Sequence, residues 1–382
     1  MKKRAVIAII SCCAVIALIF PFAMLANTHT AYFAYKEITY KTMADSIAGG
    51  PGGPVEEASR INSYFHRYLF TPFGAQAVDK DTYNDIIRGI AYCDQKAWGM
   101  SSFLAKRGMD SRMVMTVNPD GQSNHTALEA DINGGWKYFD PQYSLVIRGK
   151  DGEITSYREI CEDPSLLPGS ARMGMLKKAC PEEFAPVAGY LGKNVFNPGI
   201  IKPVVWNSPA KCKGTAKRLL SAALDAYTSL FGKRFSNIYQ DAYMRIYSGK
   251  STYNKDYFLA RNYDIYGRTE KAIYHYRKFI GGSPDDADRH AATLFLSIIY
   301  TNTGDYKAAI EALRMMADGP GSSKWGPTVN YWLGYNYELQ DDRERAEGRY
   351  RESIKGCAKT GDVSDAVKIL ELDSFERLAG LI

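Results

Sequence analysis

The sequence lacks the patterns that mark metal-binding and nucleic-acid-binding proteins. Its seven cysteines form no C-x-x-C pair of the kind that holds zinc, and no D-x-[DN]-x-[DN]-G loop indicates calcium. The net charge is only +6, and a solvated surface or linker explains the densest basic run, KCKGTAKR at 211–218. We therefore expect no nucleic-acid partner. The chemistry predicted below requires neither a metal nor another cofactor.

Charge is also absent from one long segment near the N-terminus. Residues 5–26, AVIAIISCCAVIALIFPFAMLA, are mostly apolar, and a helix of that length spans about 30 Å of hydrocarbon. The basic residues of MKKR in front of it favour a cytoplasmic N-terminus. We therefore expect a single N-terminal transmembrane helix that anchors the protein in a membrane. Its soluble part would then be extracytoplasmic, in the periplasm or at the cell surface. A cleaved signal peptide within residues 1–27 is the alternative, although MLA is a poor cleavage site.

The rest of the chain divides by pattern into four parts. Residues 28–52 contain most of the run IAGGPGGP at 47–54, which is typical of a flexible linker. Residues 53–150 carry segments of helical period and then three short strand-like runs closed by turns, which predicts an α+β domain with an antiparallel meander. Residues 151–215 have no steady period and form a connecting region. Residues 216–382 are helical in pattern.

The helical part contains an internal repeat with an interval of 37 residues. Five positions recur in three copies: Leu259, Leu296, Leu333; Ala260, Ser297, Gly334; Tyr263, Tyr300, Tyr337; Gly267, Gly304, Asp341; and Ala272, Ala309, Ala346. This pattern resembles the tetratricopeptide repeat, which implies an all-α solenoid of stacked helical hairpins. Such stacks usually present a concave surface to a protein or peptide partner. Packing of the solenoid onto the first domain is the alternative.

One cysteine stands at a predicted helix start, where chemistry is favoured. Cys93 begins CDQKAWGMSSFLAKRG, and the positive end of a helix dipole lowers the pKa of a thiol. Residues 53–150 contain two histidines, and His66, in an amphipathic helix, is most simply structural. His125 begins a strand, and Asp140 follows fifteen residues later on the next strand, where antiparallel pairing can place the two side by side. The three residues together predict a thiol–imidazole–carboxylate triad, although each also has a purely structural explanation.

The stretch YCDQKAWGMSSFLAKRGMDSRMVM and the later HTALEADINGGWKYFDP resemble the core of the transglutaminase-like superfamily. The resemblance covers residues 55–147 and includes an aromatic residue before the cysteine, a glycine-containing turn into a strand, and an aspartate followed by proline. It implies a papain-like triad of Cys93, His125 and Asp140 that catalyses acyl transfer. The sequence differs from the family pattern at Ala91, where glycine is frequent, and at Ala127, where tryptophan is frequent.

The expected function is that of a membrane-anchored extracytoplasmic cysteine hydrolase or acyltransferase with a protein-binding repeat domain. Its substrate would be a protein or peptide, and hydrolysis is favoured over cross-linking. The alternative is a catalytically inactive scaffold or assembly factor of an envelope or polysaccharide-export complex. A third reading places Cys93 in a disulfide. Cys161, Cys180, Cys212 and Cys357 could also form disulfides in an oxidising compartment, with a connectivity that the sequence leaves open.

Overall fold

The computed structural model describes most of the chain. The described residues are 19–71, 81–117, 123–163, 165–166, 170, 173–174, 177, 202–207, 214–250, 254–282, 286–317, 322–359 and 365–381. The helices that pack before the sheet include α2 (Thr28–Ala48), α3 (Pro54–Tyr68), α4 (Thr82–Arg88) and α5 (Cys93–Lys106). The rings of Phe65 in α3 and Phe103 in α5 meet at a centroid distance of 4.9 Å, in the core that these helices share.

Helix α2 occupies a segment that we expected to be a linker. Its N-terminus is capped by Asn27, whose side chain accepts the N–H groups of His29 and Thr30. Buried residues lie on all sides of it, and Tyr35 and Ile38 are fully buried. A helix that is buried all round lacks the one-sided apolar stripe by which a surface helix is identified in a sequence. This is why the helix was missed.

A small antiparallel sheet follows α5. Its strands are β1 (Ser111–Val117), β2 (Ser123–Ile132), β3 (Gly135–Phe139) and β4 (Lys202–Asn207), in the order β3-β2-β1-β4. Asn133 and Gly134 join β2 to β3 with positive φ values of 55° and 80°, as a two-residue hairpin turn requires. The short helix α6 (Tyr157–Glu162) comes after β3. Strand β4 comes from the connecting region, where no strand was expected.

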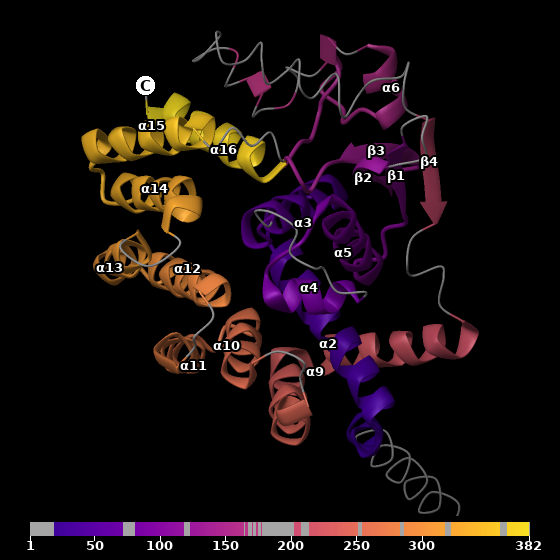
Figure 1. The fold of residues 1–382 in the computed structure, drawn as a ribbon. Helices are drawn as coiled ribbons and strands as arrows, with labels where there is room; N and C mark the ends of the chain where they lie inside the picture. The colour runs from indigo at the N-terminus through magenta and orange to yellow at the C-terminus, as the bar shows by residue number, and fades with distance from the viewer. Residues whose placement is uncertain are drawn as a thin grey trace, which may run out of the picture.

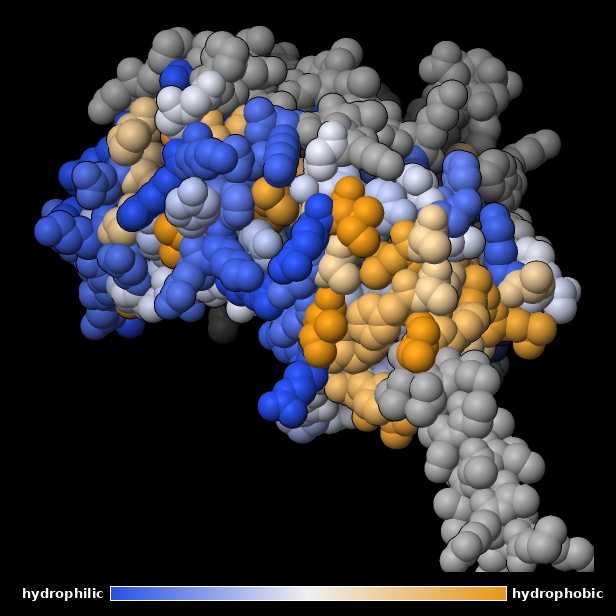
Figure 2. Space-filling view, turned by 90° about the horizontal axis from the view of Figure 1, so that it is seen from below, coloured by the Kyte–Doolittle hydropathy of each residue, from blue (hydrophilic) through white to orange (hydrophobic). Residues whose placement is uncertain are grey.

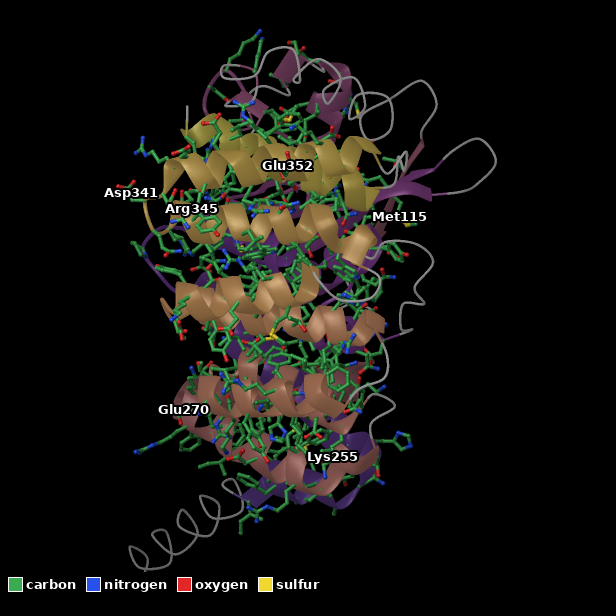
Figure 3. The ribbon with its side chains drawn as sticks, turned by 60° about the vertical axis from the view of Figure 1, so that its left-hand side comes forward. Met115, Lys255, Glu270, Asp341, Arg345 and Glu352 are labelled. Carbon is green, nitrogen blue, oxygen red and sulfur yellow. The ribbon has the colours of Figure 1, made fainter. Side chains whose placement is uncertain are left out.

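The C-terminal half is a stack of helices (Figures 1 and 3). Its elements are α9 (Thr215–Tyr247), η3 (Ser248–Lys250), α10 (Lys255–Ile265), α11 (Thr269–Gly282), α12 (Asp286–Asn302), α13 (Tyr306–Ala317), α14 (Ser322–Glu338), α15 (Arg343–Lys359) and α16 (Asp365–Leu381). The turn residues of the repeat, Gly267, Gly304 and Asp341, all adopt a left-handed φ, between 58° and 79°. The alanines at the fifth repeated position are fully buried. The repeated residues therefore lie at the turns and contacts of three helical hairpins.

The solenoid curves around the N-terminal helices and contacts them at both ends (Figure 1). At one end α9 packs along α2, where the rings of Tyr35 and Tyr243 stack at 4.0 Å. At the other end Leu372 and Phe375 of α16 join Tyr138 and Tyr143 in a buried cluster on the sheet side. Part of the solenoid surface is therefore used for contacts within the chain. Binding of a protein partner to the repeats stays a prediction.

The expected fold class is wrong. We predicted an α+β transglutaminase-like or papain-like domain followed by an all-α solenoid, with a single N-terminal transmembrane helix. The described residues are predominantly helical and have one small sheet. One core cluster runs from α2 through the sheet to α9 and α10, so the helices on both sides of the connecting region share a core. The sequence pattern separates the parts before and after residues 151–215. It therefore gives no sign that helices from both parts pack in one core.

The expected membrane anchor is corrected as well. Within the part of the chain that the structure describes, no helix is both long enough and apolar enough to cross a membrane. Residues 5–18 of the apolar run lie outside the described residues, while residues 19–23 are helical and Met24–Ala26 form the 3₁₀ turn η1. The prediction of a membrane-anchored protein with an extracytoplasmic soluble part is therefore withdrawn.

Apolar side chains gather on one face of the described residues (Figure 2). Among the described residues, α9 carries five large apolar side chains that are exposed: Leu219, Leu230, Phe231, Ile238 and Ile246. Exposed apolar area of this kind is typical of an interaction surface.

Candidate active site

Helix α5 begins at Cys93, as the sequence predicts. Tyr92 before it is extended, with φ −85° and ψ 178°, and its N–H group donates to the side-chain Oε1 of Gln95 at 3.0 Å. This contact ties the chain entering the helix to the first turn of the helix. The Cys93 side chain is partly exposed, whereas Ala91 and Lys96 nearby are buried. The thiol is thus placed at a helix N-terminus with access to solvent.

His125 lies on β2 and is buried, with 2% of its surface exposed. Its Nε2 atom is 2.9 Å from Oδ2 of Asp140, and its ring lies 5.5 Å from the ring of Tyr143. Cys93 interacts with the same imidazole. Because Nε2 faces the carboxylate, the Nδ1 edge of the ring is the one available to the thiol. The structure therefore brings together all three residues of the predicted triad.

The charges around His125 favour its protonated form. Burial by itself would lower the pKa of His125, but the Asp140 carboxylate and the interaction with Cys93 outweigh it and hold that pKa well above its ordinary value. An imidazolium that persists at neutral pH stabilises a neighbouring thiolate and can protonate a leaving group.

Asp140 is fully buried and is held by four donors. Its Oδ2 atom accepts from His125 and from the hydroxyl of Tyr138 at 3.1 Å, and its Oδ1 atom accepts the N–H groups of Gln142 at 2.9 Å and Tyr143 at 3.1 Å. Burial would raise the pKa of Asp140, but the charge on His125 and the two N–H donors keep it below its ordinary value. The carboxylate is therefore ionised and fixed in the orientation that aligns the imidazole.

Glu129, on β2, has a structural role. Its Oε2 atom accepts from Nε of Arg112 at 2.8 Å, and its Oε1 atom accepts the N–H group of Tyr157 at the start of α6 at 2.9 Å. The Arg112 guanidinium in turn lies 4.1 Å from the ring centroid of Trp136. The carboxylate thus joins β1 and β2 to α6.

We expect Glu129→Gln to destabilise the protein without changing the reactivity of Cys93. The amide still accepts from Tyr157 but loses the charge that pairs with Arg112, a loss of about 1–3 kcal/mol for a hydrogen bond to a charged group. Urea unfolding would measure the change in stability, and alkylation by iodoacetamide would measure the thiol. A large fall in the alkylation rate of the folded variant would instead place Glu129 among the groups that activate Cys93.

A partly buried chain of hydrogen bonds beside the triad was not found from the sequence. Nζ of Lys96 donates to Oγ1 of Thr71 at 3.1 Å, and that hydroxyl donates to Oε1 of Gln142 at 3.2 Å. These residues belong to no motif. The one available signal was the position of Gln142, two residues after Asp140, where the backbone turns to reach the carboxylate.

His66 also has a more specific place than the sequence indicates. Its Nδ1 atom lies 2.9 Å from the carbonyl oxygen of Gln142, and its Nε2 atom lies 2.9 Å from Oδ1 of Asp373 in α16. This side chain therefore connects the loop after Asp140 to the last helix of the solenoid. Asp373 is more than 300 residues away in the sequence, so the contact leaves no local pattern.

Cys93 and Cys161 are not in disulfides, and within the described residues no group of three His, Cys, Asp or Glu side chains could hold a metal ion. Cys180 and Cys212, which the sequence left open for disulfides, lie outside the described residues. Comparison with known proteins adds no assignment: no family model, curated protein or solved structure matches this chain.

Proposed function

We propose that this protein is a thiol-dependent acyl-transfer enzyme whose nucleophile is Cys93. The order of the groups carries the proposal. A partly exposed thiol stands at the first turn of a helix, a buried imidazole interacts with it, and a fully buried carboxylate lies behind the imidazole at 2.9 Å. Nucleophile, base and orienting group in this order are what Cys–His–Asp catalysis requires. The resemblance of the surrounding sequence to the transglutaminase-like superfamily supports the same chemistry.

In the proposed reaction the Cys93 thiolate attacks the carbonyl carbon of an amide or ester and forms a C–S bond. The His125 imidazolium gives its proton to the leaving amine or alcohol as the C–N or C–O bond breaks, and a thioester remains. Water, or an amine in a cross-linking reaction, then loses a proton to His125 and attacks the thioester. The thiolate is released and the imidazolium is restored. Asp140 stabilises the imidazolium and fixes its orientation.

We infer that a protein or peptide amide is the substrate and that water is the acceptor, following the resemblance stated above. A catalytically inactive scaffold is the competing function. It requires no activated thiol, so it predicts that Cys93 reacts like any other partly exposed cysteine. The reactivity of Cys93 therefore separates the two functions.

The test uses a second cysteine of the same chain as its reference. Cys161 is also partly exposed, and burial raises the pKa of its thiol. With iodoacetamide at pH 6 and mass mapping of the labelled peptides, we expect Cys93 to be alkylated at least about tenfold faster than Cys161, because a thiolate is the reacting form. In urea the two rates should converge. Equal rates in the folded protein would exclude the enzyme and leave the scaffold.

A further inference from the structure

The segment that leads into Cys93 is short and is held at both of its edges. Helix α4 ends at Arg88 and is capped by Gly89, whose φ of 73° turns the chain, and α5 begins four residues after this glycine. On one side the N–H group of Phe70 donates to the Gly89 carbonyl at 2.8 Å, and the N–H group of Ala91 donates to the Phe70 carbonyl at 2.9 Å. A shift of residues 86–91 would therefore move the first turn of α5 and the thiol with it.

On the other side, helix α10 of the solenoid binds the carbonyl groups at the end of α4. Nε of Arg261 donates to the carbonyl of Ile87 at 2.6 Å and Nη2 to the carbonyl of Ile86 at 3.3 Å, while the Tyr257 hydroxyl donates to the carbonyl of Arg88 at 2.7 Å. The last carbonyls of a helix have no partner within the helix and carry partial negative charge. A buried guanidinium from another part of the chain satisfies them here, since Arg261 is only 3% exposed.

Helix α12 contacts the same turn through Phe295. Its ring lies 3.7 Å from the Arg261 guanidinium carbon and 5.3 Å from the ring of Phe70. A Cβ atom added to Gly89 would stand 2.0 Å from the Phe295 ring, so the ring packs directly on the backbone of the turn. Phe295 thus touches both segments of the short pairing between Phe70 and Ile90.

We propose that Arg261 and Phe295 are positioning residues for the Cys93 nucleophile. The solenoid fixes the position of residues 86–91, and with it the position of the thiol relative to His125. The repeat helices therefore support the active site. The inference rests on the thiol chemistry proposed above. It assigns to α10 and α12 a role in the reaction that is separate from any binding of a partner.

The test follows the pH dependence of Cys93 alkylation in Arg261→Met and Phe295→Leu, with Arg268→Met as the matched control. Arg268 is another arginine of the solenoid, and its side chain pairs with Asp241 and lies over the ring of Tyr263 rather than on residues 86–91. In the wild type we expect fast alkylation to persist to low pH. In the two positioning variants we expect the rate at pH 6 to fall about tenfold and the profile to approach that of an ordinary thiol, with a pKa near 8.5.

Arg261→Lys should recover part of the rate, since an ammonium can still donate to one of the carbonyls. Circular dichroism shows which variants fold. If Arg261→Met does not fold, Phe295→Leu and Arg261→Lys are used for the test. If the wild type is alkylated fast at low pH and the folded positioning variants give the same pH profile, this inference is overturned and the proposed function is not. An ordinary thiol profile in the wild type would overturn the proposed function, and this inference with it.

Discussion

Asp140→Asn is expected to reduce the alkylation rate of Cys93 at pH 6 by about 100-fold, as the thiolate fraction falls toward that of a free thiol. The amide has nearly the shape of the carboxylate, and its oxygen can still accept the N–H groups of Gln142 and Tyr143. Its nitrogen, however, would face Nε2 of His125 as a donor. The imidazole proton would then have to sit on Nδ1, toward the thiol, so His125 could no longer accept the thiol proton.

The same change removes the charge that raises the pKa of His125. The rate should therefore be measured from pH 5 to pH 10, where the variant should approach the wild-type rate only as the free thiol itself ionises. Tyr138→Phe is the control, because it removes one donor to Asp140 and leaves the carboxylate charge in place. We expect its rate to remain within about tenfold of the wild type, in line with the net value of one hydrogen bond. If Asp140→Asn shows the same pH dependence of Cys93 alkylation as the wild type, the carboxylate does not act on the thiol.

Stability should respond to pH through the same pair. The pKa of Asp140 is lowered in the folded protein, so its contribution is present above the unfolded value of about 3.9 and is lost as the pH falls through the folded pKa. The pKa of His125 is raised, so its contribution is complete below about 6.5 and is lost as the pH rises through the raised value. The stability difference between wild type and Asp140→Asn should therefore be largest between the two unfolded values, from about pH 3.9 to about pH 6.5. Urea unfolding at pH 5.5 and pH 9 would measure it.

The candidate site could be predicted from the sequence because its parts lie in local patterns. Helix α5 starts at Cys93, where the sequence changes to helical period, and the turn between β2 and β3 carries the asparagine and glycine typical of a hairpin. That hairpin places β3 beside β2, and the two strands bring Asp140 next to His125. The fifteen residues from His125 to Asp140 span one hairpin, so the pairing of these two side chains could be predicted from the sequence.

The support of the site could not be predicted, since it comes from distant parts of the chain. Arg261 and Phe295 reach the turn before Cys93 from more than 150 residues away, and Asp373 meets His66 from α16. In the sequence, Arg261, Phe295 and Asp373 look like ordinary residues of the solenoid helices. Helix α2 escaped prediction for the opposite reason, because it is buried on all sides and so shows no amphipathic period.

Lys106→Met is expected to lower the free energy of unfolding by about 3–5 kcal/mol, the cost of leaving a buried charge without its partner. Nζ of Lys106 donates to Glu37 of α2 at 2.7 Å and to Asp225 of α9 at 2.6 Å, and the side chain of Glu37 is only 1% exposed. The substitution leaves the Glu37 carboxylate in the core with the hydroxyl of Ser221 as a donor. This ion pair joins α5, α2 and α9, so its loss weakens the contact between the N-terminal helices and the solenoid.

The neighbouring Arg107→Met supplies the control in the same measurement. Arg107 forms ion pairs with Asp45 and Glu57, but its side chain is 27% exposed, and surface pairs of this kind contribute about 0–1 kcal/mol. The double variant Lys106→Met with Glu37→Met removes both buried charges and should recover much of the lost stability, because apolar residues often replace a buried pair without loss. A Lys106→Met cost as small as that of Arg107→Met would mean that water reaches Glu37. The contact between α2 and the solenoid would then rest on apolar packing and on neutral hydrogen bonds such as that from Thr42 to Ser236 at 2.7 Å.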